Sequence, residues 1–270
     1  MRRDCMIPIV MALILGGRLL GHDKWESISA GAGSDDAAGF GYGATNVLVH
    51  GVVQTHDLEG SLASPDEDWM LVPTTARHSY EARLVGLSGL ADYGGCTTCI
   101  QFSRVNAGGE ILTDQSHPLG PNGAVSVRWT STETQAGEYL RVRGNTSVAP
   151  PTANDQYTIE FFDTTLFGAR FNNTATQVTV LFLQNTTRSV VTGAVHFYSA
   201  SGSLLHSAPL SVPVQGLHVH NTAAIGALSG QGGSLAITHD GGYGGLSGKA
   251  VALEPATGFT FDTPLVSLPR

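Results

Sequence analysis

The chain has few charged residues and almost no lysine. Charged residues make up 13% of its 270 residues, and the only lysines are Lys24 and Lys249. The net charge of −8 is unevenly distributed, because residues 24–164 contain 17 acidic and 7 basic side chains, whereas residues 165–270 contain 3 and 4. Neither part has the basic stripe that neutralises nucleic-acid phosphates, so we do not expect a nucleic-acid partner.

Long apolar runs are also absent. The run from Met6 to Leu15 is too short to span a bilayer, and it follows Arg2 and Arg3 in the order typical of a signal peptide. We therefore predict that residues 1–23 are a signal peptide and that the mature protein is secreted or displayed at a bacterial cell surface. A buried N-terminal strand or a wrongly chosen start codon would give the same pattern. No second segment could hold the protein in a membrane.

Cysteine is scarce, with three residues, and Cys5 would be lost with the signal peptide. An exported chain that keeps only Cys96 and Cys99 most simply joins them in one disulfide. A Cys-x-x-Cys pair also occurs in redox centres and as half of a zinc site. Neither a thioredoxin-like βαβ pattern nor two further nearby ligands accompany this pair, so we predict a disulfide.

Glycine is abundant, with 34 residues, and it separates short segments in which apolar and polar side chains alternate. In His78–Val85 the alternation places Glu81 and Arg83 on the face opposite the apolar residues, and Ala124–Thr130 and Gln156–Phe162 alternate in the same way. Such alternation is typical of strands with one buried face, and no segment repeats at helical spacing. The pattern predicts an all-β protein of two consecutive antiparallel β-sandwich domains, jelly-roll or immunoglobulin-like.

The most pronounced β pattern covers Gln177–Leu183 and Ser189–Tyr198, which are rich in Val, Leu and Phe. The polar residues Asn185–Arg188 separate the two segments. Two β-rich segments joined by a short polar break predict a hairpin.

The domain organisation follows from composition. Residues 24–44 are mostly Gly, Ala, Ser and Asp with little to bury, so we expect a flexible lead-in. The acidic part then forms one sandwich, residues 45–164, and the nearly neutral part forms another, residues 165–270. The boundary is expected at Asp163–Thr165.

Three segments of the first domain, Leu58–Leu62, Asp66–Trp69 and His78–Tyr80, place an acidic turn before an aromatic strand. This order is similar to that of bacterial pre-peptidase C-terminal domains, over residues 47–162. The resemblance implies secretion and an accessory role, and some members of this family bind calcium near the N-terminal linker.

The second domain also resembles a known module, a C-terminal β-sandwich of unknown function found on exported bacterial proteins. The similarity rests on Arg170–Asn173, Leu183–Asn185, Ser234–Gly241 and Lys249–Phe259. It implies a surface role and supplies no catalytic residue.

Two sets of residues are candidate metal ligands. Asp66 and Asp68 could offer hard oxygen ligands to calcium, although acids also favour turns for local reasons. His218 and His220 lie on one face of a predicted strand, as a zinc or copper pair would require, but the sequence names no third ligand. Without a metal, we expect them to be exposed residues of a strand face.

The sequence contains no catalytic motif such as G-x-S-x-G or H-E-x-x-H. We expect its acids to lie mostly in turns or on outward strand faces, with pKa values that solvent keeps near normal. The prediction is a non-enzymatic exported protein that binds a protein or a glycan. The alternatives are a self-assembling subunit of an extracellular layer or fibre, in which the N-terminal segment adds a strand to a neighbouring copy, and a small metal-dependent enzyme.

Overall fold

The computed structural model describes residues 46–57, 67–86, 100–117, 125–144 and 156–270. Every strand in these ranges belongs to an antiparallel sheet, which confirms the all-β prediction. None of the helices among the described residues has the length and hydrophobicity that a membrane crossing requires. The predicted signal peptide, the lead-in and the predicted disulfide Cys96–Cys99 lie outside the described residues.

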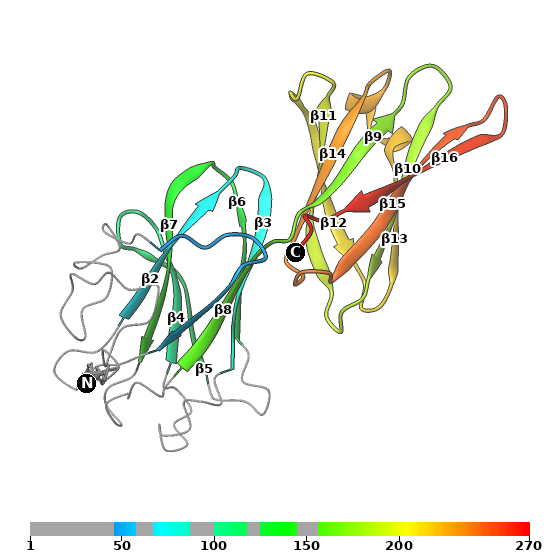
Figure 1. Ribbon diagram of the computed structural model, residues 1–270. Coiled ribbons are helices and arrows are strands. Elements are labelled where there is room, and N and C mark those ends of the chain that lie inside the picture. Colours follow the sequence, from blue (N-terminus) through cyan, green and yellow to red (C-terminus); the bar gives the residue numbers. More distant parts are fainter. Residues whose placement is uncertain (1–45, 58–66, 87–99, 118–124, 145–155) are drawn as a thin grey trace, which may run out of the picture.

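The N-terminal domain is a sandwich of two four-stranded sheets (Figure 1). One sheet has the order β1-β8-β3-β6, and the other has the order β2-β7-β4-β5. The strands are β1 (Val53–Asp57), β2 (Glu67–Thr74), β3 (His78–Val85), β4 (Ile100–Val105), β5 (Ile111–His117), β6 (Val125–Ser131), β7 (Gln135–Gly144) and β8 (Gln156–Asp163).

The C-terminal domain is built from one eight-stranded sheet with the order β12-β11-β14-β9-β16-β15-β10-β13, which folds over a single core. Strand β16 connects the two halves of the sheet, because it pairs with β15 along most of its length and with β9 at its end. The strands are β9 (Leu166–Asn172), β10 (Val178–Asn185), β11 (Val191–Ser199), β12 (Leu204–Val212), β13 (Leu217–Asn221), β14 (Gly232–His239), β15 (Leu246–Glu254) and β16 (Phe259–Val266), with two 3₁₀ turns, η2 (Thr222–Ala224) and η3 (Gly226–Leu228).

The predicted hairpin between β10 and β11 is wrong. Strand β10 pairs with β13 and β15, whereas β11 pairs with β12 and β14. The buried side chain of Asn185 accounts for the change of direction. Its amide donates to the carbonyls of Ser189 (2.7 Å), Val212 (3.2 Å) and Pro213 (2.9 Å), and its carbonyl accepts from Thr187. These bonds turn the connection into a corner between the two halves of the sheet.

Each domain has its own cluster of buried hydrophobic side chains. In the N-terminal domain the alternation predicted from the sequence is found in the structure, and Val127, Leu140 and Ile159 are at most 1% exposed. Three aromatic side chains of this core, Tyr80, Trp129 and Phe161, have ring centroids 5.4–6.2 Å apart.

Candidate functional site at the domain junction

The chain passes from the first domain to the second through three buried residues. Asp163, Thr164 and Thr165 are 6%, 2% and 0% exposed. Strand β8 ends at Asp163 and β9 begins at Leu166, so only two residues separate strands of different domains. So short and buried a connection leaves little freedom for one domain to move relative to the other.

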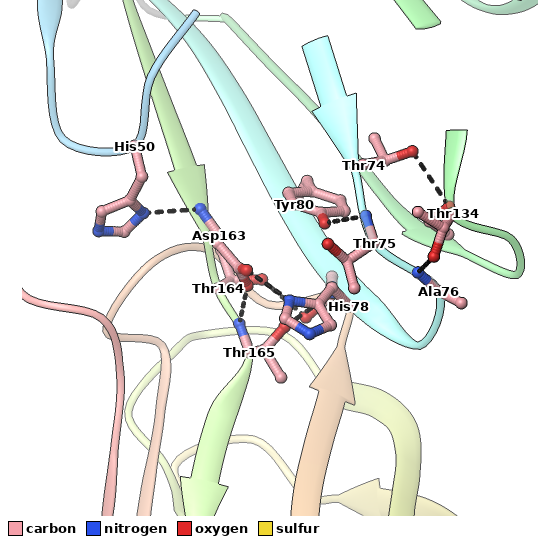
Figure 2. Close-up of polar contacts among 12 residues, drawn as sticks. His50, Thr74, Thr75, Ala76, His78, Tyr80, Thr134, Asp163, Thr164 and Thr165 are labelled. Carbon is pink, nitrogen blue, oxygen red and sulfur yellow. Dashed lines mark hydrogen bonds and ion pairs between the residues drawn. The ribbon is translucent and has the colours of Figure 1, made fainter. Parts of the chain in front are cut away.

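Asp163 is the centre of the polar contacts at the junction, which Figure 2 shows. Its carboxylate accepts from Nδ1 of His78 at 2.6 Å and from the backbone N–H of Thr165 at 3.0 Å. Its own N–H donates to Nδ1 of His50 at 2.9 Å, and Nε2 of His50 then donates to the carbonyl of Pro269 at 3.1 Å. Asp163 thus binds groups from β3, from the segment before β1 and from the connection that leads into β9.

Ser79 on β3 forms a second set of cross-domain bonds. Its hydroxyl accepts from the hydroxyl of Thr164 (2.9 Å) and from the backbone N–H of His239 (3.2 Å), and its N–H donates to the hydroxyl of Thr165 (3.0 Å). Alternation places Ser79 on the outward face of β3, yet it is 0% exposed, because β14 of the second domain lies against that face.

Glu81 is the next residue on the same face of β3, and it holds a loop of the second domain. Its carboxylate accepts from Nε of Arg128 at 2.8 Å and from the backbone N–H of Tyr243 at 2.9 Å. Burial alone would raise the pKa of Glu81, but the Tyr243 N–H and the Arg128 guanidinium outweigh it and hold that pKa below its ordinary value. The expectation that Glu81 lies in water with a near-normal pKa is therefore wrong.

The pKa of Asp163 is also lower than its ordinary value. Burial alone would raise the pKa of its carboxyl group, but hydrogen bonds from His78 and Thr165 outweigh burial and lower that pKa. Both carboxylates are therefore held in the ionised form by donors on which the junction depends.

The C-terminal residues close one side of the junction. The hydroxyl of Tyr243 donates to the carbonyl of Leu268 at 2.6 Å, and its ring stacks on Phe162 of the first domain with centroids 4.8 Å apart. The guanidinium of Arg270 lies 4.7 Å from the ring centroid of Phe162 and 5.0 Å from that of Tyr243. Figure 1 shows this end of the chain between the two domains.

A polar cleft of about 490 Å³ opens beside these contacts, with walls from both domains. Glu81, Arg83 and Arg128 line it from the first domain. Residues 186–187, 189–191 and 240–245 line it from the second. We call this space the polar cleft.

Comparisons with known proteins give structural likeness only. No protein-family model and no curated protein matches the chain. Among solved structures, the pre-peptidase C-terminal domain of a Bacillus anthracis collagenase is 9% identical, with a TM-score of 0.30, over 43% of this chain and 92% of that one.

Two larger enzymes are similar over more of the chain. A Bacteroides uniformis β-glucuronidase is 9% identical, with a TM-score of 0.21, over 75% of this chain. A GH2 β-galacturonidase from Eisenbergiella tayi is 8% identical, with a TM-score of 0.22, also over 75%. The matches cover 26% and 34% of these enzymes.

Of the two predicted calcium ligands, the structure describes only Asp68, and Asp68 does not lie in an exposed turn. Asp66 lies outside the described residues. Asp68 is the second residue of β2, is 3% exposed and accepts a hydrogen bond from the hydroxyl of Tyr157. The predicted turn ends earlier than expected, because Glu67 and Asp68 already pair with Arg143 and Val142 of β7.

His218 and His220 lie together on the edge strand β13, with ring centroids 5.9 Å apart. They pair with Leu183 and Leu181 of β10, which are fully buried, and both histidines are half-buried rather than exposed. Burial lowers the pKa of His220, and the neighbouring His218 lowers it further. Within the described ranges, no three or more His, Cys, Asp or Glu side chains gather in a way that could hold a metal ion.

The buried histidines predict how stability depends on pH. Burial lowers the pKa of His239, although its bond to Thr164 opposes the shift, and burial also lowers the pKa of His196. The unfolded chain therefore binds more protons than the folded chain below about pH 6.5, and stability falls as the pH falls. We expect the thermal midpoint to drop between pH 7 and pH 5. A second drop is expected below about pH 4, where Glu81 and Asp163 become protonated on unfolding.

The pH series can be tested with paired variants. His239→Gln should flatten the dependence between pH 7 and pH 5, whereas Ser211→Gln, at an exposed position of β12 without a titratable group, should leave its slope unchanged. Because a lowered pKa in the folded chain changes the free energy of unfolding as the pH falls, calorimetry across the pH series measures the effect. A midpoint that rises on acidification over this range would contradict the prediction.

Proposed function

We propose that this protein is a non-catalytic binding protein whose polar cleft holds a neutral glycan segment of a partner. The main support is that the ionisable groups of the cleft are already paired. Glu81 bonds to Arg128, and the Asp240 carboxylate accepts from the N–H (2.7 Å) and the hydroxyl (2.6 Å) of Thr192. Carboxylates held in this way are poorly placed to exchange protons with a substrate, whereas the cleft can still bind one.

The character of the cleft favours a neutral polar ligand. Two acids, Glu81 and Asp240, face two bases, Arg83 and Arg128, so the lining has no net charge. Hydroxyl side chains and a glycine-rich loop supply most of the remaining wall. A peptide groove would instead present apolar and aromatic pockets for anchor residues.

Arg128 is the side chain in the cleft best placed to bind sugar hydroxyls. It is 41% exposed although it is paired with Glu81, and a guanidinium carries five N–H donors, more than Glu81 uses. The ion pair fixes its orientation, which reduces the entropy lost when a ligand binds.

The buried junction supports the same role. Because two domains form the walls and several hydrogen bonds hold the domains together, the cleft exists before the ligand arrives. Secretion or surface display, predicted from the N-terminal residues, would place the cleft where bacteria meet extracellular polysaccharides.

The proposal is tested by calorimetric titration with neutral cello-, malto- and chito-oligosaccharides. We expect one series to bind, with an affinity that rises with chain length until the cleft is filled. Ser189→Tyr places a large side chain at an exposed position of the lining and should weaken binding by about tenfold or more, equivalent to about 1.4 kcal/mol.

The matched control is Ser211→Tyr, at an exposed position of β12 outside the cleft, which should bind like the wild type. Absence of binding in all three series would contradict the glycan proposal. Binding that Ser189→Tyr leaves unchanged would contradict the assignment to this cleft.

A further inference from the structure

A second cleft, of about 340 Å³, lies where His78 of the first domain meets the sheet of the second domain. It has a different character from the polar cleft, because most of its wall is apolar. Phe167, Ala169, Ala236 and Val266 contribute to that wall, and His78, Tyr198 and Ser234 are its polar side chains. The volume lies within the usual range for small-molecule sites. We call this space the His78 cleft.

The orientation of His78 is fixed. Its Nδ1 donates to the carboxylate of Asp163 at 2.6 Å, and Asp163 is itself buried and bonded to the N–H of Thr165. The imidazole ring contacts two aromatic rings, with its centroid 5.4 Å from that of Phe167 and 6.3 Å from that of Tyr80. A ring held by one strong hydrogen bond and two aromatic contacts has little freedom to turn.

This orientation leaves one ring nitrogen for a ligand. Because the carboxylate accepts the Nδ1 proton, Nε2 of the neutral ring is an acceptor. Figure 2 shows that Nε2 points away from Asp163, and within the described part of the chain no hydrogen-bond donor reaches it. The His78 cleft therefore combines apolar walls with a positioned acceptor.

A ligand that fits has one hydroxyl donor and an apolar body. A charged ligand would lose its hydration against the apolar wall, and the Asp163 carboxylate is not free to pair with a cation, since it already accepts from His78. An aromatic body matches the exposed parts of Phe167 and Val266, because aromatic rings gain from edge or offset contacts with one another.

We propose that the His78 cleft is a binding site for a small aromatic alcohol of the phenol class. The phenol hydroxyl donates to Nε2 of His78, and the ring packs against Phe167, Ala236 and Val266. The Asp163 carboxylate acts as a positioning group, since it sets the tautomer of His78. The site is separate from the polar cleft, and either assignment can fail without the other.

The test compares 4-methylphenol with toluene, which has the same ring and methyl group without the hydroxyl. Binding to the full chain is followed at pH 8 by the ¹H–¹⁵N spectrum and by the ring nitrogen signals of His78. We expect 4-methylphenol to bind about fivefold to tenfold more tightly than toluene, the effect of one hydrogen bond, and to shift the Nε2 signal of His78.

Two variants distinguish recognition from folding. His78→Phe keeps an aromatic ring of similar shape and should abolish the preference for 4-methylphenol. Ala169→Phe fills the cleft from an exposed position, keeps both His78 and Asp163 in the sequence and should weaken binding of both compounds. The control is Ala227→Phe, at an exposed position in η3 outside the cleft, which should bind both compounds normally.

Three results would overturn the proposal: equal affinity of the wild type for the two compounds, a preference that survives in His78→Phe, or no binding of 4-methylphenol at millimolar concentration. If His78→Phe does not fold, Ala169→Phe and the Nε2 signal of the wild type still decide the question.

Discussion

Gly193→Ala is expected to destabilise the C-terminal domain by about 3 kcal/mol, because the added methyl group has no space and cannot rotate away. A Cβ atom at this position of β11 would lie 1.9 Å from the carbonyl oxygen of Thr238 and 2.9 Å from Cα of His239. Both atoms belong to the backbone of the neighbouring strand β14. The two strands must therefore move apart, which weakens their hydrogen bonds.

The measurement is urea denaturation of the full chain, followed by far-ultraviolet circular dichroism. Gly226→Ala is the matched control, since a Cβ atom there meets nothing within 4 Å and Gly226 has no positive φ. We expect its stability to change by less than about 0.5 kcal/mol. A normal midpoint for Gly193→Ala would show that β11 and β14 are not in this register.

Glu81→Ala is expected to cost about 2 kcal/mol and to uncouple the two domains. The substitution leaves the N–H of Tyr243 and the guanidinium of Arg128 without their shared acceptor. The cost stays below that of breaking a fully buried ion pair, because Arg128 is 41% exposed and water can solvate it.

The tryptophans make the uncoupling measurable. All three, Trp25, Trp69 and Trp129, precede the second domain, so tryptophan fluorescence reports on the first part of the chain and circular dichroism reports on both domains. We expect the two signals to change together in the wild type and at different urea concentrations in Glu81→Ala.

Glu160→Ala is the matched control. Glu160 pairs with Arg83 on the same face of the same sheet, but it makes this ion pair within the first domain. We expect a loss of about 0.5–1 kcal/mol with coincident transitions. Coincident transitions in Glu81→Ala as well would show that Glu81 does not couple the domains.

The candidate site can be predicted from the sequence only in part. The composition of Asp240–Gly245 predicts a loop between strands, and the structure has one there, but nothing in that composition indicates that Tyr243 bonds to Glu81, which is 162 residues away. His78 and Asp163 are likewise 85 residues apart in the chain. Contacts at such separations leave no period in the sequence, so alternation reveals neither the junction nor the two clefts.

The hairpin error has a related cause. The β-rich composition of β10 and β11 correctly indicates two strands, but composition does not specify the partner strand. The corner depends on Asn185 reaching the carbonyls of Val212 and Pro213, which lie 27 and 28 positions later in the chain. A polar break of the same composition could equally have formed a hairpin.

The sequence by itself determined the strands and their inner faces. In β6 and β8, every residue that alternation places inward is buried, because the period of two is a property of the local backbone. Only the tertiary structure decided which residues of the outer faces are exposed to solvent and which are buried. Ser79 and Glu81 on β3 follow the same polar pattern as solvated residues, yet they are 0% and 2% exposed. The reason is that a second domain covers them, and its position is set by contacts between residues far apart in the chain, which alternation within one strand cannot encode.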